Sequence, residues 1–377
     1  MLFYKFIRSI LSIFLSSIII SDPIKETKNM NQINKKFQEI EVTYQNKSAN
    51  ITLSGTLTIP EKTGPCPAVL LIPGMGPVDR DGTTYYGHKP SLAIANYLTQ
   101  NGIAVLRFDK RGTGKSTGTF DLNVTAHDLT QDAQAGINYL KSCPEINPSQ
   151  IGLIGHSEGG LIATIVAANS NDIAWIILLS GAIVHSTDGL IEQVAVQLHA
   201  DGASDAMIEY DKIIRTQILN LLKHNNNPQD TITQMHTIFA SYWAQLPDDL
   251  KAESTKLSWA FSQANKDTLF NFMNSDYYRF MITHDSSKDL SQIKIPLLAL
   301  CGELDFMAPH TVFPVINQAM ALSGNKDYTT LELSKLNHSF QTCTTGAMTE
   351  YATIKETISP IALDVMTQWI LQHTTGK

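Results

Sequence analysis

Apolar residues along this 377-residue chain gather in short runs that polar or glycine-containing segments separate. Most runs are apolar throughout, a pattern typical of parallel strands buried on both faces of a sheet, and longer amphipathic stretches between them predict helices. The strands are expected at residues 37–44, 51–59, 68–73, 103–109, 151–155, 175–180, 295–301 and 328–333. After a first hairpin, the alternation of strands with helices predicts an α/β fold with an eight-stranded, mostly parallel sheet flanked by helices.

A long segment between the sixth and seventh expected strands departs from this alternation. Helical periodicity is present at residues 189–200, 205–223 and 231–245. We therefore expect residues 183–294 to form a helical cap on a core made of residues 37–182 and 295–377. The later part of this cap is rich in aromatic side chains, which either pack the cap on the core or line a cavity. Packing is the more common role for any single one of them.

The segment Gly155-His156-Ser157-Glu158-Gly159 lies between the fifth expected strand and an apolar helix-like run. A strand, sharp turn and helix in this order hold a serine on a strained backbone, with its hydroxyl exposed above the sheet. The turn closes only when the residues two before and two after the serine lack bulk, and both are glycine here. We predict that Ser157 is a nucleophile; the alternative is a glycine-rich turn with an unreactive serine.

A serine nucleophile needs a base and an orienting carboxylate, which in this architecture follow it in the order serine, acid, histidine. Asp305 follows the seventh strand at its carboxyl end, where open α/β sheets place their sites, and is the expected acid. Glu303 leaves the same strand end and is the alternative. His338 lies on the loop after the last strand and is the expected base. The other histidines lack this placement, and His156 is expected to point elsewhere on its strand.

Two backbone N–H groups are needed to stabilise the oxyanion of a tetrahedral intermediate. Glu158 supplies one of them because it directly follows the expected nucleophile. The second is expected from the loop Gly74-Met75-Gly76-Pro77 after the third strand, where the glycines permit close approach of the backbone, and Met75 is the expected donor. The alternative interpretation of this segment is an ordinary loop.

These residues make the chain resemble α/β-hydrolases, and within that fold bacterial esterases and lysophospholipase-like serine hydrolases. Their oxyanion loop reads Gly-x-Gly-Pro-x-Asp-Arg-Asp, as residues 74–81 do here. Similar proteins also carry segments like residues 105–116, 277–280, 337–341, 345–346 and 356–360, and the resemblance runs from about Phe37 to Ile370. It implies an α/β-hydrolase fold with a helical cap inserted after the sixth strand. Met75 is a departure, because relatives often have a small residue at that position.

The leading functional hypothesis is a carboxylesterase that acts on small or medium acyl esters through an acyl-enzyme. A lysophospholipase or lipase-like enzyme is the near alternative, and a peptidase or thioesterase would use the same three catalytic residues. A hypothesis of another class is a non-catalytic binding protein on a hydrolase scaffold, which is disfavoured because every catalytic position is filled. No cofactor is expected, and no His-Glu-x-x-His or clustered Cys/His pattern indicates a metal.

Charge and composition narrow the class of partner. The chain is 43% hydrophobic and 17% charged, as expected of a globular enzyme. Its formal net charge of -7, with only short basic runs, argues against nucleic acid or an anionic membrane as the main partner. A small-molecule ester is the expected substrate, and membrane contact is expected only if the amino-terminal segment is retained or the substrate is a lipid. The sequence gives no indication of the oligomeric state.

The segment Gly112-Thr113-Gly114-Lys115-Ser116 invites comparison with a phosphate-binding loop. Such a loop needs an earlier glycine at the position that Asp109 occupies, so nucleotide binding is not supported. The segment is expected to form a turn after the fourth strand, with Asp109 and Arg111 available for structural ion pairs.

The charged residues 79–81 are expected to brace the oxyanion loop; the alternative is that they are solvated.

The amino terminus has a basic start and an apolar run from Ile10 to Ile20, followed by polar residues. This pattern predicts a signal peptide over residues 1–20, or a short uncleaved anchor, and a polar linker over residues 21–36. The protein is therefore expected to be exported, either periplasmic or secreted.

Four cysteines allow disulfides in such a protein. Cys66 and Cys143 precede neighbouring strands at the same end and form the expected bridge, whereas Cys301 is expected to be a small buried residue.

Overall fold

The computed structural model describes residues 37–61, 64–181, 187–257, 259–307 and 312–374. The signal peptide expected over residues 1–20 and the linker expected over residues 21–36 lie outside these ranges and stay predictions. The strands are β1 (Phe37–Asn46), β2 (Ile51–Pro60), β3 (Cys66–Ile72), β4 (Ala104–Phe108), β5 (Ile146–His156), β6 (Trp175–Leu179), β7 (Leu297–Gly302) and β8 (Tyr328–Leu333). The helices are α2 (Pro90–Gln100), α3 (Ala126–Ser142), α4 (Glu158–Asn169), α5 (Thr187–Ala200), α6 (Asp205–His224), α7 (Pro228–Gln245), α8 (Asp248–Ser254), α9 (Lys266–Met273), α10 (Asp276–Thr283), α11 (Ser286–Leu290), α12 (Phe313–Ser323) and α13 (Pro360–Thr374), with a short 3₁₀ helix, η2 (Met348–Ala352).

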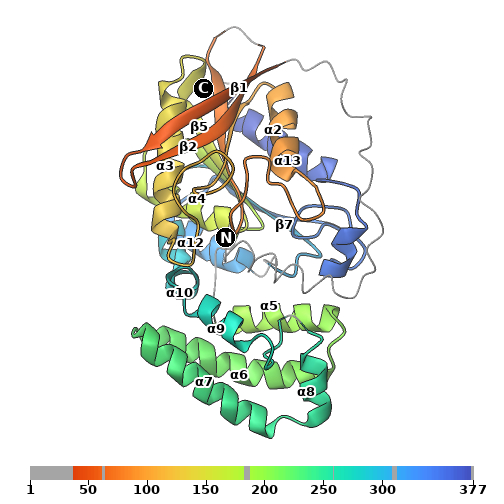
Figure 1. Cartoon of the computed structure of the whole chain (residues 1–377). Coiled ribbons are helices and arrows are strands. Elements are labelled where there is room, and N and C mark those ends of the chain that lie inside the picture. Colours follow the sequence, from red (N-terminus) through yellow and green to blue (C-terminus); the bar gives the residue numbers. More distant parts are fainter. Residues whose placement is uncertain (1–36, 62–63, 182–186, 258, 308–311, 375–377) are drawn as a thin grey trace.

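The eight strands form one sheet in the order β1-β2-β4-β3-β5-β6-β7-β8 (Figure 1). β1 and β2 form a hairpin, β2 runs antiparallel to β4, and every pair from β4 to β8 is parallel. The prediction of an eight-stranded, mostly parallel sheet flanked by helices is therefore confirmed. The carboxyl ends of parallel strands share one edge of a sheet, so the loops after β3, β5, β7 and β8 leave the sheet at the same edge.

The two faces of the sheet bury alternate residues of each strand. Leu70 and Leu106 face a core to which α3, α4 and α12 contribute, while Val69 and Val105 face a second core to which α2 and α13 contribute. All four side chains are fully buried. Burial on both faces is the physical reason that these strands are almost entirely apolar, and the one charged residue in them, Arg107 of β4, is buried in an ion pair with Asp81.

Within the residues that the structure describes, the chain between β6 and β7 contains the helices α5 to α11, joined by turns, and no strand. Figure 1 shows α5 to α8 as a lobe below the part of the molecule that contains the sheet. Phe239, Phe261 and Phe270 pack inside an apolar core of this lobe, together with Met207 and Met235. These aromatic rings therefore stabilise the helical lobe itself, and the expected boundaries of a cap at residues 183 and 294 stay predictions. None of the described helices is both long enough and apolar enough to cross a membrane.

All four cysteines are free thiols, so the expected disulfide between Cys66 and Cys143 is wrong. The two residues do lie near neighbouring strand ends, because Cys66 begins β3 and Cys143 directly follows α3. However, each thiol donates a hydrogen bond to a different backbone carbonyl: Cys66 to that of Glu145 and Cys143 to that of Tyr139, both at 3.4 Å. Cys301 is buried in β7, as expected, and its burial raises the pKa of the thiol.

The sharp turn between β5 and α4 depends on two close backbone contacts. A Cβ atom at Gly155 would lie 2.1 Å from the carbonyl oxygen of Gly159, and a Cβ atom at Gly159 would lie 2.1 Å from the carbonyl oxygen of Ile72. No side chain tolerates so short an approach to backbone. The expectation that this turn needs two residues without bulk is therefore confirmed, and the reason is the packing of α4 against β5 and β3.

These contacts predict that Gly155→Ala lowers the free energy of unfolding by at least about 2 kcal/mol, since the backbone must move to admit the methyl group. Gly74→Ala is a matched control, because a Cβ atom there would meet its nearest neighbour, the Cβ atom of Ser157, at 3.4 Å, an ordinary contact. Urea denaturation of both variants measures the difference. Equal stability of the two variants would contradict the steric explanation of the turn.

Candidate active site

Ser157 occupies the turn between β5 and α4 at the carboxyl edge of the sheet. Its backbone has φ 52° and ψ -120°, a strained conformation for a residue with a side chain. The strain is held in place because the Ser157 N–H donates to the carbonyl of Leu179 in β6 at 2.9 Å. Ser157 is partly buried, and among the described residues its hydroxyl forms no hydrogen bond with His338. The local geometry is that of a nucleophile presented above a sheet.

Asp305 and His338 lie in hydrogen-bond contact although 33 residues separate them. The Nδ1 atom of His338 lies 2.9 Å and 3.1 Å from the two carboxylate oxygens of Asp305. Asp305 is 1% exposed and His338 is 7% exposed, so water is largely excluded from the pair. Since a carboxylate only accepts hydrogen bonds, Nδ1 carries the proton, and Nε2 is left with its lone pair.

Glu303, the alternative acid, lies in a different environment. Its carboxylate accepts hydrogen bonds from the hydroxyl of Ser334 at 2.7 Å and from the N–H of Lys335 at 2.8 Å. Both bonds lower the pKa of the Glu303 carboxyl, and the bond from Ser334 has the larger effect. The geometry therefore pairs His338 with Asp305 and uses Glu303 to fix the turn that leads from β8 toward His338.

The loops that carry the acid and the histidine are held together through their backbones. The N–H of Leu304 donates to the carbonyl of Leu336 at 2.9 Å, and a Cβ atom at Gly302 would lie only 2.2 Å from that same carbonyl oxygen. Glycine at this position thus allows the loop after β8 to approach the end of β7. The side chain of Asn337 then accepts the N–H groups of Ser339 and Gln341, both at 3.0 Å, which fixes the turn around His338.

Tyr351 is a further neighbour of the pair that the sequence did not single out. Burial and the negative charge of Asp305 raise the pKa of its phenol, and its hydroxyl faces the backbone of His338 and the side chain of Ser339. The segment that carries Tyr351 is fixed by Glu350, whose carboxylate accepts three backbone N–H groups from residues 344–346. No sequence pattern identified Tyr351, because its position depends on how this segment folds back over the loop after β8.

His156 does not point away from the site, and that expectation was wrong. Its Nε2 atom donates a hydrogen bond to the backbone carbonyl of His338 at 2.9 Å, and the two imidazole rings lie 5.0 Å apart between centroids. The reason is that His156, still paired with Leu179 at the end of β5, lies on the same face of the sheet as Ile154, and there it meets Phe340 of the loop after β8. Burial, and secondarily the charge of His338, lower the pKa of His156 to about 4.

The loop expected to hold the oxyanion lies beside the nucleophile. A Cβ atom at Gly74 would lie 3.4 Å from the Cβ atom of Ser157, which shows how closely the two backbones approach. The side chain of Met75 is 46% exposed and is not part of the core. Glu158 begins α4, so its N–H belongs to the amino-terminal turn of that helix, where backbone N–H groups favour negative charge.

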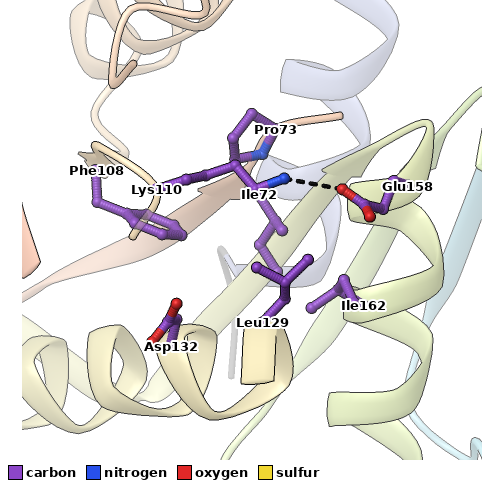
Figure 2. Close-up of a pocket in the computed structure, with 8 residues that line it drawn as sticks. All are labelled: Ile72, Pro73, Phe108, Lys110, Leu129, Asp132, Glu158 and Ile162. Carbon is purple, nitrogen blue, oxygen red and sulfur yellow. Dashed lines mark hydrogen bonds and ion pairs between the residues drawn. The ribbon is translucent and has the colours of Figure 1, made fainter. Parts of the chain in front are cut away.

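Three consecutive charged residues follow β4, and all three are buried and paired. Asp109 forms an ion pair with Arg80 at 2.8 Å, and Arg111 forms one with Asp132 at 2.7 Å. The structural ion pairs expected for Asp109 and Arg111 are therefore present. Arg80 also binds the side chain of Ser54 and the carbonyl of Gly55, so it braces the oxyanion loop against β2 rather than being solvated. Beyond these expectations, Lys110 also pairs, with Glu158 at 2.8 Å (Figure 2).

Lys110 is a residue that the sequence reasoning missed. The sequence feature that could have identified it is its position between two charged residues directly after a buried strand, because all three charged side chains need partners once the segment is buried.

Within the described residues, no group of three or more histidine, cysteine or acidic side chains is arranged to hold a metal ion.

The lowered pKa of His156 predicts a pH dependence of stability. Between its unfolded value near 6.5 and its folded value of about 4, the unfolded chain binds a proton that the folded chain does not, so stability falls as the pH falls through this window. We expect wild type to lose up to about 2 kcal/mol more than His156→Gln between pH 7 and pH 5. Urea denaturation at both pH values tests this, and parallel losses in the two proteins would contradict it.

Comparison with known proteins gives the family. The model of the serine aminopeptidase (S33) family of hydrolases matches residues 91–340, a range that contains Ser157, Asp305 and His338. Among curated relatives, esterase EstD of Thermotoga maritima is 35% identical over 118 residues, which are 31% of this chain and 28% of that protein. An uncharacterised protein of Pseudomonas aeruginosa, PA2218, is 29% identical over 141 residues, which are 36% of this chain and 35% of that protein. The chain thus spans about a third of the length of these relatives.

Solved structures show the same fold at low identity. The Pyrococcus furiosus esterase Pf2001 superposes with a TM-score of 0.52 and 18% identity, over 90% of this chain and 92% of that one. The crystal structure of PA2218 superposes with a TM-score of 0.52 and 16% identity, over 94% and 100% of the two chains. The family match over residues 91–340, on a chain with this arrangement of the sheet, shows that the chain belongs to the serine aminopeptidase (S33) family of α/β-hydrolases.

Proposed function

We propose that this hydrolase is a carboxylesterase that cleaves esters of small or medium acyl groups through an acyl-enzyme on Ser157. The observation that carries the proposal is the buried hydrogen bond between His338 and Asp305 at the edge of the sheet where the strained turn presents Ser157. Esterases among the relatives and structural neighbours support the same reaction class. No cofactor enters the proposed reaction.

The histidine is prepared to act as a base by its partner. Asp305 accepts the Nδ1 proton of His338 and so fixes the tautomer in which Nε2 is unprotonated. In the proposed reaction Nε2 takes the proton of the Ser157 hydroxyl as the oxygen attacks the ester carbonyl. The imidazolium that forms is stabilised by the buried carboxylate and then donates its proton to the departing alcohol. Water repeats the sequence on the acyl-enzyme, which releases the acid and restores Ser157.

Negative charge develops on the carbonyl oxygen during both steps. We assign its two donors to the backbone N–H groups of Met75 and Glu158, because the loop of Met75 approaches Ser157 and Glu158 begins the helix directly after it. Removing a single donor of this kind typically costs about 3 kcal/mol of transition-state stabilisation.

Exposed apolar side chains close to these groups support the proposed substrate class. Met75 is 46% exposed on the oxyanion loop, and Met307, two residues after the acid, is 39% exposed. The N–H of Met307 donates to the Asp305 carboxylate at 2.9 Å, which anchors that residue beside the acid. Flexible thioether side chains adapt to apolar groups of different shape, so a small or medium acyl chain suits this surface.

An aminopeptidase is the second candidate, because the family model carries that description. Such an enzyme must bind the free amino group of a peptide, for which an unpaired carboxylate is the usual partner. In the part of the site that the structure describes, the nearby carboxylates are engaged: Asp305 with His338, Glu158 with Lys110 and Glu303 with Ser334. This favours neutral esters over peptides with a free amino terminus.

Hydrolysis of p-nitrophenyl esters from acetate to palmitate by the purified protein tests the proposal. We expect a maximum at short or medium chains and a loss of activity in Ser157→Ala of at least about 10³-fold. An optimum at palmitate would instead indicate a lipid hydrolase, and faster release of p-nitroaniline from aminoacyl p-nitroanilides would indicate a peptidase. If wild type neither hydrolyses any ester nor reacts with a fluorophosphonate at Ser157, a non-catalytic binding protein becomes the better explanation.

The choice between the two acidic residues gives a separate prediction. Asp305→Asn is expected to lower kcat by about 10⁴-fold, because an amide favours the wrong tautomer of His338. Glu303→Gln is the matched control on the same strand end, and we expect it to retain kcat since its partners are Ser334 and Lys335. Steady-state kinetics on the preferred ester measure both variants. A larger loss in Glu303→Gln than in Asp305→Asn would reverse the assignment.

A further inference from the structure

Lys110 forms three contacts that link the segment after β4 to both expected oxyanion donors. Its ammonium lies 2.8 Å from the Glu158 carboxylate and donates to the carbonyl of Gly74 at 2.9 Å. Its own backbone N–H donates to the carbonyl of Val78 at 3.1 Å, farther along the oxyanion loop. One residue thus holds the residue after the nucleophile and two points of the loop beside it.

The ammonium is buried in surroundings that make these contacts strong. Lys110 is 3% exposed and Glu158 is 2% exposed. Figure 2 shows their contact at a small cavity whose other walls include Ile72, Leu129 and Ile162. The ring of Phe120 also lies 4.8 Å from the ammonium, a cation–π contact. In such apolar surroundings water screens the charges little, so the geometry of the pair is held firmly.

The contact with Gly74 determines where the Met75 N–H points. The carbonyl of Gly74 and the N–H of Met75 belong to the same peptide unit, and the described chain contains no cis peptide. In a planar trans peptide, the C=O and the N–H point in opposite directions. When Lys110 binds the carbonyl oxygen on one side, the N–H is therefore directed to the other side. A hydrogen bond from a cation to that carbonyl also polarises the peptide and strengthens its N–H as a donor.

The contact with Glu158 has a second effect on the same site. Without Lys110 a buried carboxylate would remain directly beside the place where negative charge develops in the reaction. Within the described residues, no other lysine or arginine forms an ion pair with Glu158. Burial and the negative charge of Glu158 also raise the pKa of the neighbouring Tyr277 phenol well above its usual value, so this side chain stays neutral beside the pair.

We propose that Lys110 is a positioning residue of the oxyanion hole, which orients the Gly74–Met75 peptide and neutralises Glu158. The inference rests on the proposed function, since it needs Met75 and Glu158 to be the oxyanion donors. It adds a side chain that touches neither the substrate nor the three catalytic groups. Its effect should fall on the transition state, in which the oxyanion exists, and not on the bound ester.

Two variants separate positioning from simple stability. Lys110→Met removes the cation and leaves Glu158 buried without its partner, so it should lower both stability and kcat. The double variant Lys110→Met/Glu158→Gln removes both charges and should recover much of the stability, because uncompensated buried charge is the main cost of breaking such a pair. It should not recover kcat, because nothing then holds the Gly74 carbonyl. The matched control is Arg111→Gln/Asp132→Asn, which removes the adjacent buried pair and should leave kcat close to that of wild type.

The measurements are kcat and KM on the preferred p-nitrophenyl ester, inhibition by an alkyl trifluoromethyl ketone, and urea denaturation. We expect the double variant to lose about 10²-fold in kcat with little change in KM, and to bind the ketone, whose adduct with serine carries an oxyanion, more weakly by a similar factor. Recovery of wild-type kcat in the double variant would show that Lys110 only compensates a charge. An equal loss of kcat in the Arg111/Asp132 control would show that any broken ion pair near this loop has the effect.

Ser157→Ala in the same assay keeps the two proposals apart. If Ser157→Ala hydrolyses the ester as fast as wild type, the proposed function is wrong and the role of Lys110 falls with it. If Ser157→Ala is inactive while Lys110→Met/Glu158→Gln keeps wild-type kcat and wild-type affinity for the ketone, the function stands and only the role of Lys110 is wrong.

Discussion

The burial of three consecutive charges after β4 constrains most of the site. Asp109, Lys110 and Arg111 are each less than 8% exposed, and a buried charge without a partner costs several kcal/mol. Their partners come from three separate elements: Arg80 in the oxyanion loop, Glu158 at the start of α4 and Asp132 in α3. The chain can satisfy all three charges only when these elements have converged. These three ion pairs therefore hold the oxyanion loop, α3 and α4 against the segment after β4.

The strained turn at Ser157 depends on the same convergence. A residue with a side chain keeps φ at 52° only when its surroundings leave no alternative, and here α4 packs so closely that glycine alone fits at positions 155 and 159. On the opposite side, Gly302 allows the loop of His338 to reach the loop of Asp305. Close backbone contacts at three glycines thus determine the positions of the three proposed catalytic side chains, and hydrogen bonds then fix their orientation.

The helical lobe follows a different principle. Its large aromatic side chains pack inside a core of its own, and the buried pair of Asp211 and Arg215 is covered by Phe261. A lobe that is stabilised internally can vary in shape without disturbing the sheet or the loops at its edge. The proposed catalytic groups therefore depend on the core and the loops at its edge, and not on the packing inside the lobe.

The sequence by itself determined the fold and its proposed reactive residues, since apolar runs report burial on both faces of a sheet and the spacing of Gly155, Ser157 and Gly159 reports a turn that few sequences can form. It did not determine which side chains meet across the edge of the sheet. The contact of His156 with His338, the free thiols of Cys66 and Cys143, and the bridge made by Lys110 were decided by tertiary structure. Each depends on the direction in which a side chain leaves the backbone at a strand end or turn. A small change of the backbone dihedral angles there brings the side chain against a different residue, and no local pattern in the sequence predicts that direction.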